Sequence, residues 1–245
     1  MHDRNAGASA QAEYERRAAR HAADVRQRRP RILALGAAVA IVGLVALALN
    51  PQWGAGVVLV DLVLVGSALL TTPNSITSWQ TGAAGEVRTG RRLEPLEAEG
   101  FRILHDRKIP GSRANIDHVV IGPPGVFVVE TKSYKGSLQI RDGEIFVAGR
   151  RNNGWIDEVR RETAAVETSL ADEIAAHGWA LTPVICIHRA DLPWFRSEVQ
   201  GARVVSGKDL VSRLRKAELV LTPADVERLA ALADARLRYA LAREG

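Results

Sequence analysis

Two uninterrupted hydrophobic runs near the start of the chain stand out from the alternating pattern that follows them. Residues 32–49 are eighteen uncharged positions, and residues 54–70 are seventeen positions in which Asp61 is the single charge. A helix of about 20 apolar residues crosses a hydrocarbon core of roughly 30 Å. Neither run has the 3.6-residue periodicity of an amphipathic helix on a soluble protein. The pattern predicts a transmembrane helical hairpin over residues 32–70.

Two other interpretations of these runs are weaker. A secretory signal peptide does not fit, because a charged leader of 31 residues comes first and a second apolar run follows at once. A buried hairpin of a soluble protein does not fit the continuous apolarity. Arginines cluster before residue 32 and again over 88–92, and the connecting loop is uncharged, so both ends are expected in the cytoplasm. We expect a multi-pass protein of the cell inner (plasma) membrane with a cytoplasmic soluble domain.

Asp61 is the one ionisable group inside the predicted hairpin. A carboxyl at the centre of a bilayer costs about 2.5–3.5 kcal/mol on insertion scales. We expect it to be protonated, or to partner a polar group of a neighbouring helix or of a second protomer. A homo-oligomer contact through the hairpin is therefore one expected role, whereas ion transport lacks a second ionisable group.

From residue 82 onward the hydrophobic pattern alternates between the helix period and the strand period. Helices are predicted at 83–99 with a kink or early stop at Pro95, at 156–177, at 208–216 and from Thr222, which precedes Pro223 as an N-cap. Strands are predicted at 101–106, 115–122, 125–132, 181–188 and 202–206, with a further hairpin turning at Asp142-Gly143. This order predicts a mixed α/β domain.

Charge and cysteine content narrow the functional classes. The formal net charge is +5, but residues 1–31 alone hold eight arginines against four acidic residues, so the rest of the chain is nearly balanced. Overall charge is therefore no argument for nucleic-acid binding. The single cysteine, Cys186, excludes an intramolecular disulfide and a multi-cysteine zinc site, and its apolar surroundings predict a buried structural thiol in a reducing compartment.

The stretch IDHVVIGPPGVFVVETKSY, residues 116–134, carries the candidate chemistry. If Gly-Pro-Pro-Gly is a four-residue hairpin loop, Asp117 lies opposite Glu130 on the same face of the sheet, with Cβ atoms about 4.5–5.5 Å apart. Lys132 shares that face because side chains alternate along a strand. Two opposed carboxylates repel each other unless a cation neutralises them. The spacing favours a site for Mg²⁺ (or Mn²⁺) with a lysine beside it, as phosphodiester cleavage needs. The simpler alternative is a surface ion-pair ladder.

These residues resemble a known family. Asp117 with Glu130-Thr131-Lys132 is similar to the active-site motif of the PD-(D/E)xK nuclease superfamily. The wider stretch, GAAGEVRTGRRL followed by IDHVVIGPPGVFVVETKSYKG, resembles the NERD (nuclease-related) domain, which is often fused to transmembrane segments. The resemblance covers roughly residues 80–190 and is most specific over 82–136.

The resemblance implies a restriction-endonuclease-like mixed sheet flanked by helices, here preceded by two transmembrane helices. It implies Asp117 and Glu130 as metal ligands, Lys132 as the catalytic lysine, and Glu86 as the acidic residue that many members place near the metal. The expected function is a membrane-anchored, metal-dependent nuclease acting on DNA or RNA at the cytoplasmic side. The alternatives are a catalytically silent nuclease-fold module for binding or signalling, and a structural membrane protein.

The expected domain organisation follows from these patterns. It comprises a basic cytoplasmic tail at 1–31, the hairpin at 32–70 (32–49 and 54–70), a polar linker at 71–81, the nuclease-like domain at 82–200 and a helical extension of that domain at 201–245.

Several polar residues near the motif have simpler expected roles. His118 and Thr131 should point away from Asp117. Arg113 and Asn115 are expected to belong to loop structure rather than to phosphate contacts, and Tyr134 and Lys135 either line a nucleic-acid cleft or end a strand. The charged positions of the helix after 156 are expected to form a solvated face; they are Glu158, Arg160, Arg161 and Glu162.

Overall fold

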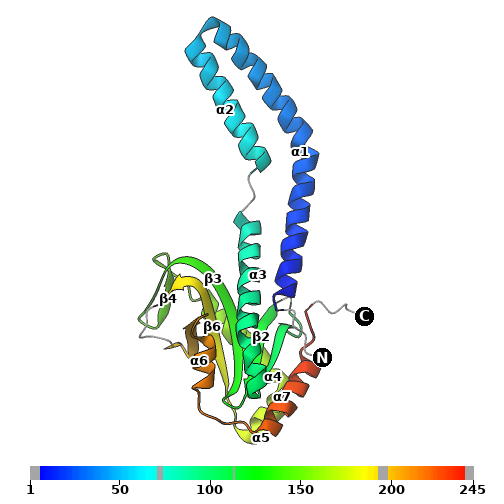
Figure 1. Cartoon of the computed structure of the whole chain (residues 1–245), viewed down its shortest axis with the longest axis vertical. Coiled ribbons are helices and arrows are strands. Elements are labelled where there is room, and N and C mark those ends of the chain that lie inside the picture. The colour runs from blue at the N-terminus through cyan, green and yellow to red at the C-terminus, as the bar shows by residue number, and fades with distance from the viewer. Residues whose placement is uncertain (1–5, 71–73, 113, 193–197, 241–245) are drawn as a thin grey trace. The chain divides into compact units, whose positions relative to one another are not determined.

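The computed structural model describes residues 6–70, 74–112, 114–192 and 198–240 (Figure 1). The chain divides into two compact units. One unit contains Met1–Gln11 together with Thr81–Gly245, and the other contains Ala12–Gln80.

The two apolar runs are helical, as their hydrophobicity predicts. They lie in α1 (Ala8–Leu49) and α2 (Pro51–Leu70), which join at Asn50. Both helices are long and apolar enough to cross a membrane, judged by length and composition. Most of their large hydrophobic side chains are exposed, which suits a lipid environment.

The helices extend further than the sequence pattern predicts. The predicted tail at 1–31 is helical from Ala8, where alanines favour a helix and pairs such as Arg28 with Asp24, one turn apart, support it. The predicted linker at 71–81 is helical from Asn74, where the described helix α3 (Asn74–Leu93) starts, so the helix expected near residue 83 is longer than predicted.

The domain is built on a mixed sheet of eight strands within the described residues. They are β1 (Arg102–Lys108), β2 (Asn115–Gly122), β3 (Gly125–Arg141), β4 (Glu144–Val147), β5 (Arg150–Arg151), β6 (Leu181–Asp191), β7 (Glu198–Val199) and β8 (Ala202–Ser206). The main order is β1-β2-β3-β6-β8-β7, with β1, β2 and β3 antiparallel and β3, β6 and β8 parallel. The far end of β3 pairs with β4, which pairs with β5. The predicted mixed sheet is confirmed.

Helices cover both faces of this sheet (Figure 1). One face is covered by α3, the 3-10 helix η1 (Glu94–Glu99) and α6 (Leu210–Arg215), and the other by α4 (Gly154–Ser169), α5 (Ala171–His177) and α7 (Pro223–Arg236). Alternate residues of β3 serve the two faces, since Phe127 packs toward α3 and α6 while Val128 packs toward α4 and α7. The sheet is therefore the middle of three layers.

Local signals in the sequence explain several element boundaries. Asp142 and Gly143 both have positive φ, 53° and 71°, as the predicted two-residue turn between β3 and β4 requires. The helix predicted at 83–99 changes to 3-10 geometry at Glu94, directly before Pro95. The helix predicted at 156–177 is interrupted at Leu170, whose φ of −116° lets its side chain enter the core between α4 and α5.

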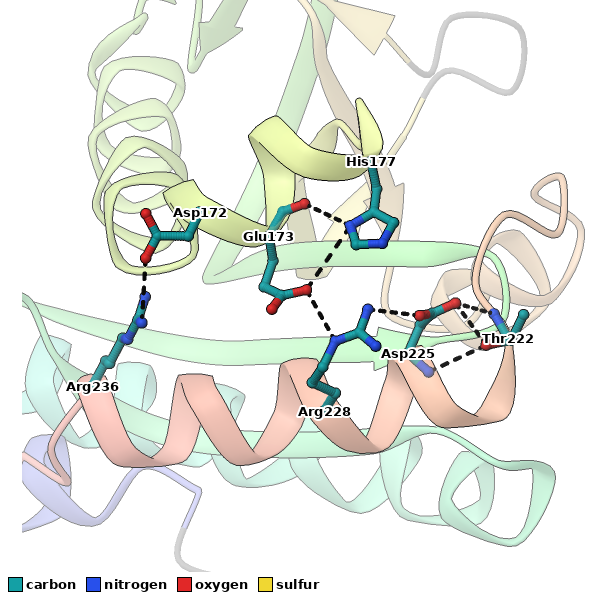
Figure 2. Close-up of polar contacts among 7 residues, drawn as sticks. All are labelled: Asp172, Glu173, His177, Thr222, Asp225, Arg228 and Arg236. Carbon is teal, nitrogen blue, oxygen red and sulfur yellow. Dashed lines mark hydrogen bonds and ion pairs between the residues drawn. The ribbon is translucent and has the colours of Figure 1, made fainter.

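The C-terminal helix is fastened by polar contacts at its start and along its length. Thr222 and Asp225 form a capping box, in which the Asp225 N–H donates to Thr222 Oγ1 and the Thr222 N–H donates to Asp225 Oδ2. Figure 2 shows Arg228 between Asp225 and Glu173, at 2.8 and 2.9 Å. These contacts hold α7 beside α5 in the same compact unit as the sheet.

Candidate active site

The hairpin of β2 and β3 brings Asp117 and Glu130 together. Gly122 pairs with Gly125, so the turn is Pro123-Pro124 rather than the four residues predicted, but the register is unchanged. His118 pairs with Val129, and the next position of this register sets Asp117 opposite Glu130. There the backbone ladder gives way to a side-chain bond, since the Thr131 N–H donates to Asp117 Oδ2 at 2.8 Å. The Asp117 carboxylate therefore lies directly beside the strand that carries Glu130.

Lys132 lies between two carboxylates. Its Nζ donates to Glu130 Oε1 at 2.5 Å and to Glu158 Oε2 at 2.6 Å. The side chains of Glu130 and Lys132 are only 6% and 17% exposed. Burial opposes a charge on Lys132, but the carboxylates of Glu130 and Glu158 outweigh it and hold the pKa of the ammonium above its ordinary value. Lys132 therefore stays positively charged at neutral pH.

The pairing of β3 with β6 is irregular directly after this lysine. The register runs through Lys132 and Ser133 and resumes at Gly136, so residues 134–135 are left out of the ladder. Bulges bend a strand and redirect side chains, and they are common beside active sites. This bulge separates the buried part of β3, which carries Glu130, from an arm formed with β4 and β5, in which exposed residues alternate with buried ones such as Leu138 and Ile145.

Helix α3 adds Glu86 from the other side of the strand end. It approaches β3 closely, because a Cβ on Gly85 would lie 3.3 Å from Thr131 Cγ2. Burial is the main factor that raises the pKa of Glu86, and repulsion from Glu130 and then Asp106 adds to it, to about 8. Glu86 is thus electrostatically part of the carboxylate cluster.

Strand β1 contributes a buried carboxylate that the sequence did not point to. The register of β1 with β2 sets Asp106 opposite Asp117, but its positive φ of 52° takes it out of regular strand geometry. Its carboxylate accepts hydrogen bonds from the N–H and the hydroxyl of Ser9, at 2.7 and 2.6 Å. The side chain of Asn115 donates to the Ser9 hydroxyl, so Asn115 has a local structural role.

Helix α4 contributes two further carboxylates, Glu158 and Glu162, one turn apart. An oxygen of each lies within 4.8 Å of the other and of an oxygen of Glu130. The prediction of a solvated face is wrong for Glu162, which is 3% exposed on the same side of α4 as its apolar residues, while Arg160 and Arg161 are exposed. The signal in the sequence was the pair of like charges four residues apart, which is unfavourable on an isolated helix.

Burial and mutual repulsion raise the pKa of the carboxyls in this cluster. For Asp117 the largest cause is burial, followed by Glu130, Glu86 and Glu162, and the hydrogen bond from Thr131 opposes them. For Glu162 burial is again the largest cause and Glu130 the next. Lys132 moderates the rise at Glu130. One ammonium thus faces several carboxylates, and additional positive charge would stabilise their ionised forms.

The donors of this cluster suit a hard divalent cation. Carboxylate oxygens are the ligands preferred by Mg²⁺, which is typically bound through one or two of them while keeping several waters. Asp117 and Glu130 are adjacent on neighbouring strands, and Glu86 lies near enough to repel both. The chemistry of these donors therefore suits a divalent cation.

The opposite face of the same strands carries buried polar side chains that bond to one another. His118 is fully buried, and its Nδ1 lies 2.7 Å from Nδ1 of His105. Thr131 donates to the hydroxyl of Thr89 at 3.0 Å. Both residues point away from Asp117, as strand alternation predicts. Cys186 is buried, and burial raises the pKa of its thiol to about 11, which agrees with a structural role.

Tyr134 and Lys135 lie at the margin of the site. Tyr134 packs edge-on against Trp155 with ring centroids 6.4 Å apart, and Lys135 is exposed beyond the bulge. Arg113 lies outside the described residues.

Comparison with known proteins agrees with this architecture. Residues 81–188 match the family model of the nuclease-related domain, NERD. An uncharacterised protein of Bacillus anthracis is 38% identical over 88 residues, which are 33% of this chain and 40% of that relative. The matched region is therefore less than half of the relative's own length. No solved structure matches the chain. The resemblance predicted from the motif is confirmed, and the match to the nuclease-related domain includes every carboxylate of the cluster together with Lys132.

Proposed function

We propose that this protein is a membrane-anchored, metal-dependent nuclease that hydrolyses phosphodiester bonds in DNA or RNA on the cytoplasmic side. The observation that carries the proposal is the convergence of Asp117, Glu130 and Lys132 at one end of the β2–β3 hairpin, with Glu86 joining from α3. Strongly perturbed ionisable groups are concentrated at functional sites. A nuclease-related fold makes phosphodiester hydrolysis the chemistry to test first.

Each residue has a distinct proposed role. Asp117 and Glu130 hold Mg²⁺ or Mn²⁺ through carboxylate oxygens. When bound, the cation supplies an activated water and stabilises negative charge on the phosphate. Lys132 brings a point charge that stabilises the charge developing on the phosphate oxygens in the transition state. Glu86 adds a third carboxylate that orients water at the same strand end.

The arm beyond the bulge supports a polyanionic substrate. It carries Lys135, Arg141, Arg150 and Arg151, all exposed. Arg151 pairs with Glu144 at 2.9 Å, and this surface pair is weak enough to exchange with a phosphate. Clustered basic groups bind nucleic acid largely through its phosphates, without regard to sequence. Strand β3 leads from the carboxylate cluster directly into this arm.

The membrane anchor is proposed from α1 and α2. Their length and apolarity suit two spans, and the arginines flanking them favour cytoplasmic ends. Asp61 is 8% exposed, and a Cβ on Gly36 of α1 would lie 3.6 Å from its Oδ1. This position favours a contact within the hairpin over the homo-oligomer contact that was also predicted.

A catalytically silent module for binding or signalling is the second candidate. The observation that favours it is the double engagement of Lys132, whose ammonium is bonded to Glu130 and Glu158 and is therefore not free for a substrate in the metal-free protein. The two candidates differ in one property, which is turnover in the presence of a divalent cation.

The full chain, purified in detergent micelles, should be incubated with single- and double-stranded DNA and RNA in Mg²⁺, Mn²⁺ or EDTA. We expect cleavage of at least one substrate that requires the cation and is lost in Asp117→Asn. A Glu167→Gln variant is the control for the loss of one carboxylate, because Glu167 is exposed on α4 and belongs neither to the cluster nor to the basic arm. A folded wild-type protein that cleaves none of the four substrates with either cation favours the silent module.

A further inference from the structure

Glu130, Glu158 and Glu162 form a second carboxylate group beside the pair of Asp117 and Glu130. One oxygen from each of the three lies within 4.8 Å of the others. Glu130 belongs to β3, and the other two belong to successive turns of α4, so two packed elements fix their spacing. Oxygens that bind one cation at about 2.0–2.6 Å are separated by comparable distances.

Glu162 provides an independent indication that something binds there. Its side chain is almost completely buried and shares a hydrogen bond with the carboxyl of Glu130, whereas Oε2 has no hydrogen-bond partner among the described residues. Leaving a buried acceptor unsatisfied costs about 1–3 kcal/mol, and more when the group is charged. The position lies on the face of α4 that otherwise carries Ile156, Val159 and Val166. The hydrogen bond with Glu130 leaves Oε2 of Glu162 unsatisfied on this otherwise apolar face, and a further ligand would satisfy it.

Lys132 accounts for only part of this negative charge. Its ammonium is bonded to Glu130 and Glu158, at 2.5 and 2.6 Å. One ammonium cannot neutralise three carboxylates, so ionising all three would leave an excess of negative charge in a largely buried space. A divalent cation would remove that excess and supply a ligand for Glu162.

We propose that Glu130, Glu158 and Glu162 bind a second divalent cation, Mg²⁺ or Mn²⁺, in the space that Lys132 bridges in the metal-free protein. The inference rests on the proposed function, since Glu130 is shared with the cation held by Asp117. Paired cations of this kind stabilise both the attacking and the leaving oxygen of a phosphodiester. Cation binding at Glu130 and Glu158 also releases the ammonium of Lys132 toward the substrate phosphate.

Counting bound Mn²⁺ on the full chain in detergent tests this proposal without any substrate. Free Mn²⁺ is measured by electron paramagnetic resonance during titration of wild type, Asp117→Asn, Glu162→Gln and the control Glu167→Gln, an exposed position on α4. We expect about two equivalents for wild type and for the control. Each of the other two variants should lose about one equivalent and keep the other.

The outcomes separate the two claims. If Glu162→Gln binds Mn²⁺ like wild type, the second cation position is wrong and Glu162 is a buried protonated carboxyl. If Asp117→Asn binds like wild type while Glu162→Gln loses one equivalent, the second position stands and the proposed role of Asp117 fails.

Glu158→Gln guards against a folding defect at the buried position. The side chain of Glu158 is 40% exposed, so its replacement should leave the fold intact. We expect the weaker of the two Mn²⁺ affinities to fall about tenfold or more. An unchanged affinity in this variant also overturns the proposal.

Discussion

Replacing Glu86 with glutamine should stabilise the metal-free protein, by an amount that depends on pH. Burial first, and then the carboxylates of Glu130 and Asp106, raise the pKa of Glu86 from 4.5 to about 8. Well below pH 4.5 the carboxyl of Glu86 is protonated in both the folded and the unfolded chain, so its titration does not change the free energy of unfolding. As pH rises from 4.5 toward 8, the unfolded chain releases this proton while the folded chain retains it, and wild-type stability falls.

The size of the effect follows from the shift. Each pKa unit corresponds to about 1.36 kcal/mol, so a rise of about 3.5 units sets an upper bound of about 5 kcal/mol on the stability lost by pH 8. Glu86 is partly exposed and its neighbours can take up protons in its place, so we expect Glu86→Gln to gain about 1–3 kcal/mol at pH 8. That gain corresponds to a rise in Tm of roughly 3–10 °C.

Thermal unfolding of the full chain in detergent and EDTA, at pH 4.5 and pH 8, provides the assay. The amide I band of β-sheet follows the domain alone, because the unit Ala12–Gln80 is helical where it is described. Glu94→Gln, at an exposed neighbouring position, serves as control and should change little. Saturating Mn²⁺ should reverse the order of stability at pH 8, since a bound cation stabilises the ionised carboxylate. A Tm for Glu86→Gln equal to or below that of wild type at pH 8 in EDTA would refute the electrostatic reasoning.

Two further predictions concern the fold. Thr222→Ala removes the capping box of α7 and should lower the free energy of unfolding by about 1 kcal/mol, which the same assay detects as a lower Tm. An unchanged Tm would show that packing alone stabilises the start of the helix. Cys186 is buried, and burial raises the pKa of its thiol to about 11. The thiol should therefore resist iodoacetamide at pH 8 in the folded protein and react once the chain is denatured, as mass spectrometry would detect. Rapid modification of the native protein would contradict the buried position of Cys186.

Local patterns predicted much of the β2–β3 region. The Gly-Pro-Pro-Gly turn determined the register, and the register placed Asp117 opposite Glu130 because paired residues of an antiparallel hairpin lie at equal distances from the turn. The N-cap at Thr222 and the turn at Asp142-Gly143 were also predicted, since helix capping and turns with positive φ depend on residues adjacent in sequence. These features are all local.

The parts that the sequence did not reveal depend on contacts between distant elements. Glu162 is 32 positions beyond Glu130, and only the packing of α4 against the sheet brings its carboxylate into the cluster. Asp106 joins through a departure from strand geometry that no periodicity predicts. Helix α3 extends back across the predicted linker. The polar residues over 74–81 are compatible with a helix, and the helix that follows them in sequence continues through them.

The most direct test of the account is a side-by-side measurement of Mn²⁺-dependent cleavage by the wild-type chain and by Lys132→Ala, with Lys208→Ala as the exposed-lysine control. Lys132→Ala should retain Mn²⁺ binding, because the carboxylates are intact, while its cleavage rate falls by about 10²–10³-fold, the loss typical of removing one group that stabilises transition-state charge. The control should cleave at the wild-type rate. Equal cleavage rates for Lys132→Ala and wild type would contradict the assignment of the active site.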